Sequence, residues 1–475
     1  MPEFAPLAPF EVSTGQRLFL GMDPADGHRP LWAGPRESVG IIGPPGYGKT
    51  SGLIVPMGLT WDGPAIITST RGDVLAATGD HRRRLAERHD GTVHVYDPFG
   101  SEPGVRSLRW SPLDGCRNAS VVYRRVGEMV EAGGAVGVEG ADHFKTGAKR
   151  ILRGLFLAAA CTDRPLETVL DWLAAGSFDE PVAVLRGLRS GPPAAARWAA
   201  ALDGMRYKGE RERGSFVSVA ENVLDAAADD KVLVSTRDTA FDVDHFLDSR
   251  STLYVLGPIH FQAALRPMIV GLVSAITERA FERAAAMPGG VLVPRLGLIG
   301  DEIANIAPLP SLPGLLSAGA GSGVVTVWAA QSLDHIRARY GTDTAAAILA
   351  ASTVKITYGG ITNDADLRMI STWAGERRVV TVGTSTGGVD VGNELTPRPG
   401  GGAIDRLGTA GRSHTTGHEW RPILPIDELR GTREGHAWLW HRSDRHLLVE
   451  TRPAGLVSPF AALAGYTPSP GGGRP

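Results

Sequence analysis

One eight-residue stretch constrains the fold of this chain more than any other. Residues 43–50 read GPPGYGKT and match the pattern GxxxxGK(S/T). They follow the apolar run 39–42 and open the pattern 51–55, so the sequence predicts a strand, a loop and a helix in that order. In such a loop backbone N–H groups converge on a phosphate, the lysine reaches the β- and γ-phosphate oxygens, and the hydroxyl takes Mg²⁺. The predicted ligands are therefore ATP and Mg²⁺, bound by Gly43, Pro44, Pro45, Gly46, Tyr47, Gly48, Lys49, Thr50 and Ser51, with Thr50 on the metal.

The second half of such a site is expected on a buried strand that ends in an acid. The apolar run 296–300 is followed by Asp301 and Glu302. We expect Asp301 to hold the Mg²⁺ shell and Glu302 to polarise the attacking water. A neutral polar side chain, Gln331, follows a later apolar run, where it can sense the γ-phosphate or the water. Lys49, Glu302 and Gln331 are therefore the predicted catalytic residues.

Short apolar runs alternate with helical patterns along much of the chain. Near-continuous runs of Val, Ile and Leu suit strands that are covered on both faces, as in parallel sheets. Such runs occur at 39–42, 65–68, 93–96, 252–256, 296–299, 324–328 and 354–358. Residues 117–235 lack them and repeat apolar residues every three or four positions instead. The sequence thus predicts an α/β fold, a P-loop NTPase core with a mostly parallel sheet and an inserted all-α domain.

These patterns also divide the chain. We place the first part of the nucleotide-binding domain at 1–116, the all-α insertion at 117–235, the second part at 236–455 and a flexible tail at 456–475. A polar, glycine-rich stretch without periodicity predicts a long mobile loop over 381–421. No signal peptide or transmembrane segment is found, so the expected location is cytoplasmic.

The charge balance restricts how the chain can contact nucleic acid. Lys and Arg number 49 against 51 Asp and Glu, so no global field attracts a polyanion and any contact must be a local patch. Lys145, Lys149 and Arg153 lie at i, i+4 and i+8 on one helix stripe and are the candidate DNA contacts, although a solvated face is the simpler interpretation. The basic cluster 81–84 is interpreted as solvated too, because acids surround it in the sequence.

Together with further motifs, these residues resemble the conjugative type IV secretion coupling proteins. The other matching pieces, which with the nucleotide motifs span roughly residues 30–455, are 69–73, 93–100, 111–114, 142–144, 214–218, 220–224, 331–334, 340–341 and 421–429. The resemblance implies a RecA-like ATPase that forms a homo-oligomer, a hexamer when active, with ATP at subunit interfaces. It also implies DNA or secreted protein as substrate, a type IV secretion or membrane partner, and recruitment to the inner face of the cell membrane.

Two features depart from that family. The family begins with two transmembrane helices, and none is found here, which indicates a form without them. The family also carries an arginine finger after the acidic strand, and this chain has Ala320 at that place. Because such a finger is worth ~10³–10⁵ in rate, its absence bears directly on hydrolysis. The candidate replacements are Arg337, Arg339, Arg377 and Arg378.

Three functions stay open on this basis. The leading one is an ATP-dependent coupling protein that recruits and translocates DNA or protein substrates for conjugative type IV secretion. The second is an ATP-binding, weakly or non-hydrolysing docking platform for secretion substrates, which Ala320 favours. The third is a DNA pump of the FtsK-HerA class. A small-molecule kinase fits least, because it leaves the acid pair 301–302, Gln331 and the loop 381–421 without a common purpose.

Overall fold

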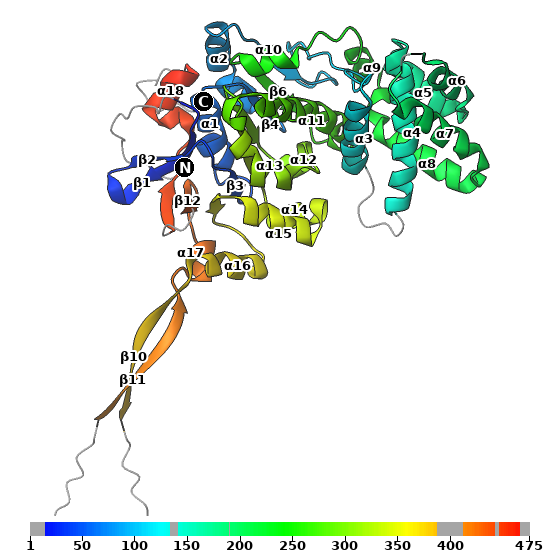
Figure 1. Cartoon of the computed structure of the whole chain (residues 1–475). Helices are drawn as coiled ribbons and strands as arrows, with labels where there is room; N and C mark the ends of the chain where they lie inside the picture. Colours follow the sequence, from blue (N-terminus) through cyan, green and yellow to red (C-terminus); the bar gives the residue numbers. More distant parts are fainter. Residues whose placement is uncertain (1–14, 134–140, 190, 387–411, 442–445, 466–475) are drawn as a thin grey trace, which may run out of the picture. The chain divides into compact units, whose positions relative to one another are not determined.

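The chain folds into two compact units (Figure 1). The computed structural model describes residues 15–133, 141–189, 191–386, 412–441 and 446–465. The first unit comprises Met1–Ile361 and Thr432–Pro475, and the second comprises Thr362–Gly431, each within those described limits. The domain boundaries near residues 116 and 235 stay a prediction.

The first unit is built on one 11-stranded sheet. Its parallel part has the order β9-β3-β8-β7-β4-β6-β5. All seven predicted runs form these strands: β3 (Val39–Ile42), β4 (Ala65–Ser69), β5 (Val93–Tyr96), β6 (Thr252–Leu256), β7 (Leu296–Gly300), β8 (Val324–Ala330) and β9 (Val354–Tyr358). The predicted α/β fold with a mostly parallel sheet is therefore confirmed.

Four further strands extend the sheet beyond β9 and are antiparallel. They are β1 (Leu18–Asp23), β2 (Arg29–Ala33), β12 (His436–His441) and β13 (Leu447–Glu450). The sequence analysis missed them. The pairing of β1 with β13, in the register Met22↔Glu450, joins the two ends of the chain, so no local pattern predicts it.

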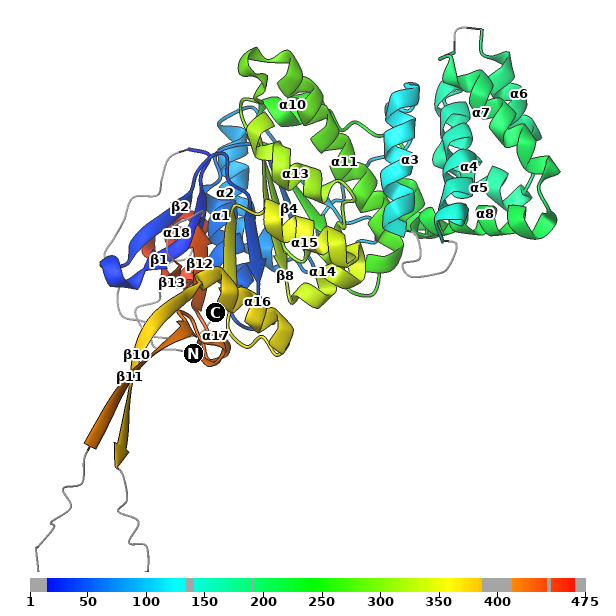
Figure 2. The ribbon, with the colours of Figure 1, turned by 60° about the horizontal axis from the view of Figure 1, so that its bottom comes forward.

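Helices cover both faces of this sheet, which explains why its strands are apolar throughout (Figure 2). On β8, Val325, Val327 and Ala329 belong to one buried cluster, together with residues of α1 (Val55–Thr60) and α18 (Ser458–Ala464). The alternate residue Trp328 is also fully buried, on the other face. There Gly40 leaves room for its ring, since a Cβ at residue 40 would lie 2.6 Å from it. The remaining helices around this sheet are α2 (Asp73–Glu87), α10 (Val243–Asp248), α11 (Gln262–Ala286), α12 (Ile303–Ile306), α13 (Leu312–Ala318), α14 (Leu333–Tyr340) and α15 (Thr342–Ala351).

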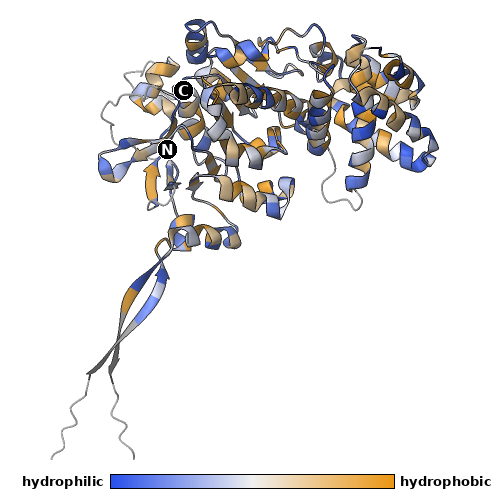
Figure 3. Ribbon diagram, in the orientation of Figure 1, coloured by the Kyte–Doolittle hydropathy of each residue, from blue (hydrophilic) through white to orange (hydrophobic). Residues whose placement is uncertain are grey.

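The segment predicted to be all-helical contains helices and no strand in its described residues, 117–133, 141–189 and 191–235. The predicted apolar positions of its first two helices, among them Val126 and Leu152, are fully buried. These helices combine hydrophobic and hydrophilic residues, as amphipathic helices do (Figure 3). Its helices are α3 (Ala119–Gly133), α4 (Ala141–Cys161), α5 (Leu166–Ala175), α6 (Asp179–Gly187), α7 (Ala194–Asp203), α8 (Glu210–Val223) and α9 (Asp230–Ser235).

The second unit corrects part of the loop prediction. It contains α16 (Asp364–Ala374), β10 (Glu376–Thr386), β11 (Arg412–Pro422) and α17 (Ile426–Arg430). β10 and β11 pair antiparallel from Glu376↔Pro422 to Thr386↔Arg412. A loop over the whole of 381–421 is therefore wrong at both ends, because β-branched Thr and Val there favour a pleated ladder. Residues 387–411 lie outside the described part.

Two other expectations are corrected by packing. The predicted flexible tail 456–475 begins with α18, and Phe460 is fully buried with its ring centroid 4.9 Å from that of Phe19; residues 466–475 lie outside the described part. In the cluster 81–84, Arg82 is fully buried and donates to the Gly63 carbonyl (2.7 Å) and the Thr252 hydroxyl (2.7 Å). A buried arginine of this kind is invisible to a local charge count, because its partners are distant backbone and hydroxyl groups.

Candidate nucleotide site

Three of the predicted site segments meet at the carboxyl edge of the parallel sheet. Residues 43–50 follow β3, Asp301 and Glu302 follow β7, and Gln331 follows β8. Because β8 pairs with both β3 and β7, these three strand ends are neighbours. Ligands of open α/β sheets bind outside this edge.

The loop after β3 has the backbone that a phosphate site needs. Gly46 and Gly48 have φ of +87° and +94°, which L side chains rarely adopt. Gly43 allows close packing, since a Cβ there would lie 2.5 Å from the Tyr358 Cβ. Within the loop, Lys49 is 6% exposed and its Nζ donates to the carbonyls of Gly43 (2.6 Å) and Pro44 (3.0 Å). Burial lowers the pKa of Lys49, and the charges of the acid pair 301–302 oppose that shift.

The loop hydroxyl contacts the acid that the sequence paired with it. Thr50 Oγ1 donates to Asp301 Oδ2 at 2.7 Å, and Thr68 Oγ1 donates to the Asp301 carbonyl at 2.8 Å. The other carboxylate oxygen, Oδ1, is buried without a hydrogen-bond partner among the described residues. Burial raises the pKa of Asp301, although the bond from Thr50 and the charge of Lys49 oppose that. An unpartnered buried carboxylate oxygen beside a hydroxyl fits a hard cation such as Mg²⁺.

Glu302 is held by two amides. Asn305 Nδ2 donates to Glu302 Oε2 at 3.2 Å, and the Gln331 side chain is hydrogen-bonded to Glu302 too. Burial and the neighbouring Asp301 charge raise the pKa of Glu302. Its backbone is left-handed, with φ 51° and ψ 42°, a conformation costly for a non-glycine residue and found at functional sites. The sequence analysis missed Asn305, although its place three residues after Glu302 in a helical turn was a usable signal.

The loop and the turn after it are also supported by residues that are distant in the sequence. Tyr47 packs against Gly360, where φ is +73° and a Cβ would lie 2.4 Å from the tyrosine hydroxyl. Gly52, in the turn after the loop, lies under the Thr451 carbonyl. Pro44 and Ser51 are half-buried and Pro45 is exposed. The two contacts made by Tyr47 and Gly52 are long-range and were not predicted.

Ala320 lies at the opposite edge of the sheet. It is 6% exposed in the 3₁₀ turn Gly319–Ser322, which precedes β8, and its carbonyl accepts from Arg295 Nη1 at 3.1 Å. Of the candidate replacements, Arg337 Nη1 pairs with Asp334 Oδ1 at 2.8 Å. Arg339 Nη2 donates to the Ala132 carbonyl at 3.0 Å. The other two candidates, Arg377 and Arg378, lie in β10 of the second unit and are exposed. The described hydrogen bond of Arg339 thus goes to the end of α3 and not to the loop 43–50.

The candidate DNA contacts are engaged with protein groups. Lys145 and Lys149 donate to the two oxygens of Glu131, at 2.9 Å and 2.5 Å. Burial alone would raise the pKa of Glu131, but the bonds from Lys149 and Lys145 outweigh it and lower the pKa. The Arg153 guanidinium lies 3.9 Å from the ring centroid of Tyr123. Their role in DNA contact stays a prediction that this geometry does not favour.

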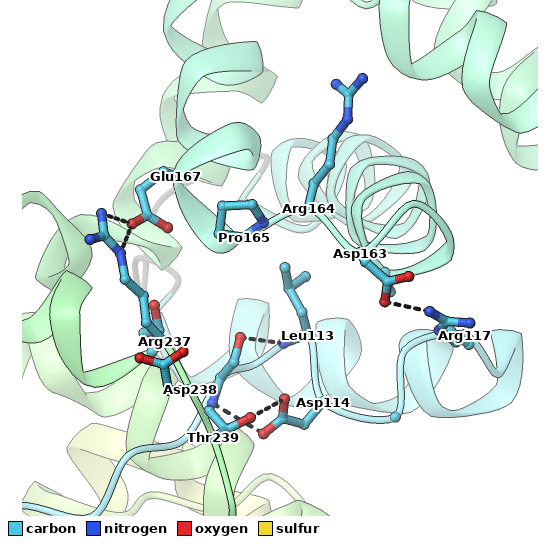
Figure 4. A pocket seen from close by; sticks show the side chains of 14 residues that line it. Leu113, Asp114, Arg117, Asp163, Arg164, Pro165, Glu167, Arg237, Asp238 and Thr239 are labelled. Carbon is cyan, nitrogen blue, oxygen red and sulfur yellow. Dashed lines mark hydrogen bonds and ion pairs between the residues drawn. The ribbon is translucent and has the colours of Figure 1, made fainter.

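A cavity of about 650 Å³ lies elsewhere, between residues 111–117, 160–167 and 236–239 (Figure 4). Four of its charged side chains pair with one another: Arg117 with Asp163 and Arg237 with Glu167. None of its lining residues is a predicted site residue, and its paired charges do not resemble a phosphate site.

No helix in the part of the chain that the structure describes is long and apolar enough to cross a membrane.

Comparison with known proteins identifies the family of this chain. The family model described as type IV secretory system conjugative DNA transfer matches residues 19–395. Two conjugal transfer proteins TraG from Escherichia coli are 25% and 26% identical, over 65% and 66% of this chain and 50% and 51% of their own length. The chain thus spans about half the length of these curated relatives.

Solved structures agree on the fold. The bacterial conjugative coupling protein TrwBdeltaN70 with sulphate has a TM-score of 0.64 at 18% identity, over 94% of this chain and 96% of that one. TrwB with the ATP analogue ADPNP has a TM-score of 0.61 at 18% identity, over 88% and 86%. The predicted resemblance is confirmed, and the chain belongs to the type IV secretory system conjugative DNA transfer family.

Proposed function

We propose that this chain binds Mg·ATP at the loop 43–50 and hydrolyses it to recruit and move DNA for conjugative transfer through a type IV secretion channel. The observation that carries the proposal is the convergence of Lys49, Thr50, Asp301, Glu302 and Gln331 at one sheet edge. TrwB structures with ADPNP and with ADP and Mg²⁺ support the choice of ligand.

The residues have separate roles in this proposal. Lys49 leaves the carbonyls of its own loop to contact phosphate oxygens, and Thr50 and Asp301 hold the metal, which when bound neutralises phosphate charge. Glu302, whose pKa is raised, accepts a proton from the attacking water, and Gln331 orients that water. The amide of Asn305 holds the Glu302 carboxylate in place until then.

We further propose that the active form is a homo-oligomer, a hexamer, with a type IV secretion or membrane partner that recruits it to the inner face of the cell membrane. Protein cargo besides DNA belongs to the same proposal.

The test is ATP turnover by the purified chain over a range of protein concentrations, with and without single-stranded DNA. Turnover that rises with both and is lost in Glu302→Gln supports an assembling ATPase. Tight Mg·ATP binding that Lys49→Ala abolishes, without any turnover, refutes hydrolysis. Directed movement of DNA without any secretion partner would instead favour the FtsK-HerA-class pump.

One observation favours the docking platform as a second candidate. Position 320 carries alanine, and its surroundings are filled by protein: the residue is buried and its carbonyl is bonded by Arg295. Without a trans-acting arginine, ATP would serve as a switching ligand. Under this candidate, substrate binding depends on ATP while turnover stays absent.

A further inference from the structure

Two arginines from different helices gather at the carboxyl end of α3. Arg339, in the last turn of α14, donates to the Ala132 carbonyl at 3.0 Å. The next residue, Gly133, lies against Pro267, since a Cβ there would be 2.9 Å from the proline ring. Arg266 directly precedes Pro267 in the first turns of α11. The fold thus brings together two guanidinium groups whose residues, 266 and 339, are 73 positions apart in the sequence.

Neither guanidinium has a carboxylate partner in the described part of the chain. Arg266 Nε donates to the Asn305 carbonyl at 3.0 Å, and the one hydrogen bond of Arg339 also goes to a carbonyl. The nearby acid on α3, Glu128, is bonded instead by the hydroxyls of Ser274 (3.4 Å) and Ser311 (3.3 Å). Burial lowers the pKa of both arginines, and the charge of Arg266 helps to lower that of Arg339 to about 10. Two like charges are therefore held together without a counter-ion.

The free donors of this pair reach solvent. An arginine carries five N–H groups, and capping a helix end uses one of them in each residue. Both side chains are partly exposed, and no nitrogen of either is buried without a partner. Helix capping alone thus leaves a fork of donors open to an outside ligand. Guanidinium forks of this kind match the oxygens of a phosphate group.

The pair is joined to the proposed catalytic glutamate from two sides. Arg266 bonds the carbonyl of Asn305, whose side chain donates to Glu302 Oε2 at 3.2 Å. Arg339 lies in the last turn of α14. This helix begins two residues after Gln331, which is itself hydrogen-bonded to Glu302. A ligand that draws Arg266 away from Asn305 therefore acts on the residue that restrains Glu302.

We propose that Arg266 and Arg339 form a phosphate-binding site for the DNA backbone, and that its occupation releases Glu302 from Asn305 and so links DNA binding to ATP hydrolysis. The inference rests on the proposed function and adds to it the DNA-contacting residues and the positioning residue that carries the signal. Phosphate contacts are blind to base identity, so the site suits a transferred strand of any sequence.

The first experiment measures binding of a fluorescently labelled oligothymidylate by anisotropy over a series of salt concentrations. Arg266→Gln and Arg339→Gln each should lower the affinity and make the plot of log K against log salt shallower by about 0.7, the value for one single-strand phosphate contact. Arg339→Lys keeps the charge and should keep most of the slope. Arg83→Gln is the matched control, because that exposed arginine is paired with Asp80 on α2. Wild-type affinity and slope in both glutamine variants, with unchanged thermal unfolding, overturn the site.

The second experiment separates binding from coupling. Asn305→Ala should bind the oligonucleotide like the wild type, while the ratio of turnover with DNA to turnover without DNA falls towards one. A merely structural role of Asn305 would change both rates and leave that ratio unchanged, which would overturn the coupling.

The same phosphate chemistry could come from the nucleotide of a second copy of the chain. In that case Arg266→Gln and Arg339→Gln would lose the rise of DNA-free turnover with protein concentration and keep wild-type DNA binding, which overturns a DNA site. A wild-type chain that neither binds DNA nor hydrolyses ATP refutes the proposed function itself, whereas wild-type DNA binding with unaltered variants refutes only this inference.

Discussion

Replacing Asp301 by asparagine tests the metal half of the site. Asn keeps the shape of the side chain, and its amide oxygen can still accept the 2.7 Å bond from Thr50 Oγ1. What it removes is the negative charge and the buried, unpartnered Oδ1 that a cation would face. We therefore expect Asp301→Asn to fold normally and to lose the contribution of Mg²⁺ to nucleotide affinity.

The size of this loss can be judged from the known effect of removing groups around a bound metal. Removing a group that only supports a metal ligand costs 10–100-fold in metal affinity, about 1.4–2.7 kcal/mol, so the loss of a carboxylate that faces the metal should cost at least as much. The assay is titration of a fluorescent ATP analogue at fixed neutral pH, with and without Mg²⁺. The affinity gained on adding Mg²⁺ should shrink by at least that factor, while metal-free ATP binding through Lys49 stays near wild type.

Stability provides the control for this variant. The pKa of Asp301 is raised in the folded state, so the wild type loses stability as the pH rises from the ordinary carboxyl pKa to the raised one. At neutral pH the variant avoids that cost and should unfold at no lower temperature than the wild type. A full Mg²⁺ effect in a folded Asp301→Asn chain would refute the role of Asp301.

Three further predictions concern packing and pH. Phe460→Ala should lower the free energy of unfolding, measured in urea, by about 3–5 kcal/mol, because the ring is fully buried against Phe19. A loss below about 1 kcal/mol would show that the packing of α18 does not stabilise the fold. Burial, with Arg82 and its neighbours, lowers the pKa of His81 from 6.5 to about 4. The wild type should therefore lose up to about 3 kcal/mol of stability as the pH falls from 6.5 to 4, and His81→Gln should lose less in the same denaturation series. Parallel curves of stability against pH for the two proteins would contradict this. Gly360→Ala should weaken ATP binding, because a left-handed alanine costs about 1–2 kcal/mol and its Cβ collides with Tyr47; unchanged affinity by calorimetry would show that the loop does not need this support.

Local patterns were enough to predict the parallel half of the fold, and they selected nucleotide-site candidates on segments that the fold brings to one sheet edge. Seven apolar runs became seven parallel strands, because a strand covered on both faces must be apolar at nearly every position. The loop 43–50 and the acids 301–302 could be picked out from the sequence for a different local reason. Their chemistry requires particular residue types at short spacing.

Contacts between residues far apart in the sequence could not be predicted from local patterns. The antiparallel pairings of β1 with β13 and of β9 with β12 join strands far apart in the chain, and the ladder of β10 with β11 pairs residues from 376 to 422 across an intervening segment. Two lysines of the basic stripe proposed for DNA binding are paired with Glu131, a residue on another helix. A local stretch of residues shows the charge of a side chain but not its partner.

Contiguous residues specify the P-loop core, the order of its parallel strands along the chain and the acid pair opposite the loop, so these features could be predicted before the fold was known. The three-dimensional arrangement alone establishes which charges are paired with protein groups and which remain available. Lys145 and Lys149 share one carboxylate, Arg82 is buried, and Arg266 and Arg339 are left together without an acid in the described chain. That distinction depends on pairing across long sequence separations, where the free energy of a charge is set by its neighbours in space rather than in the chain.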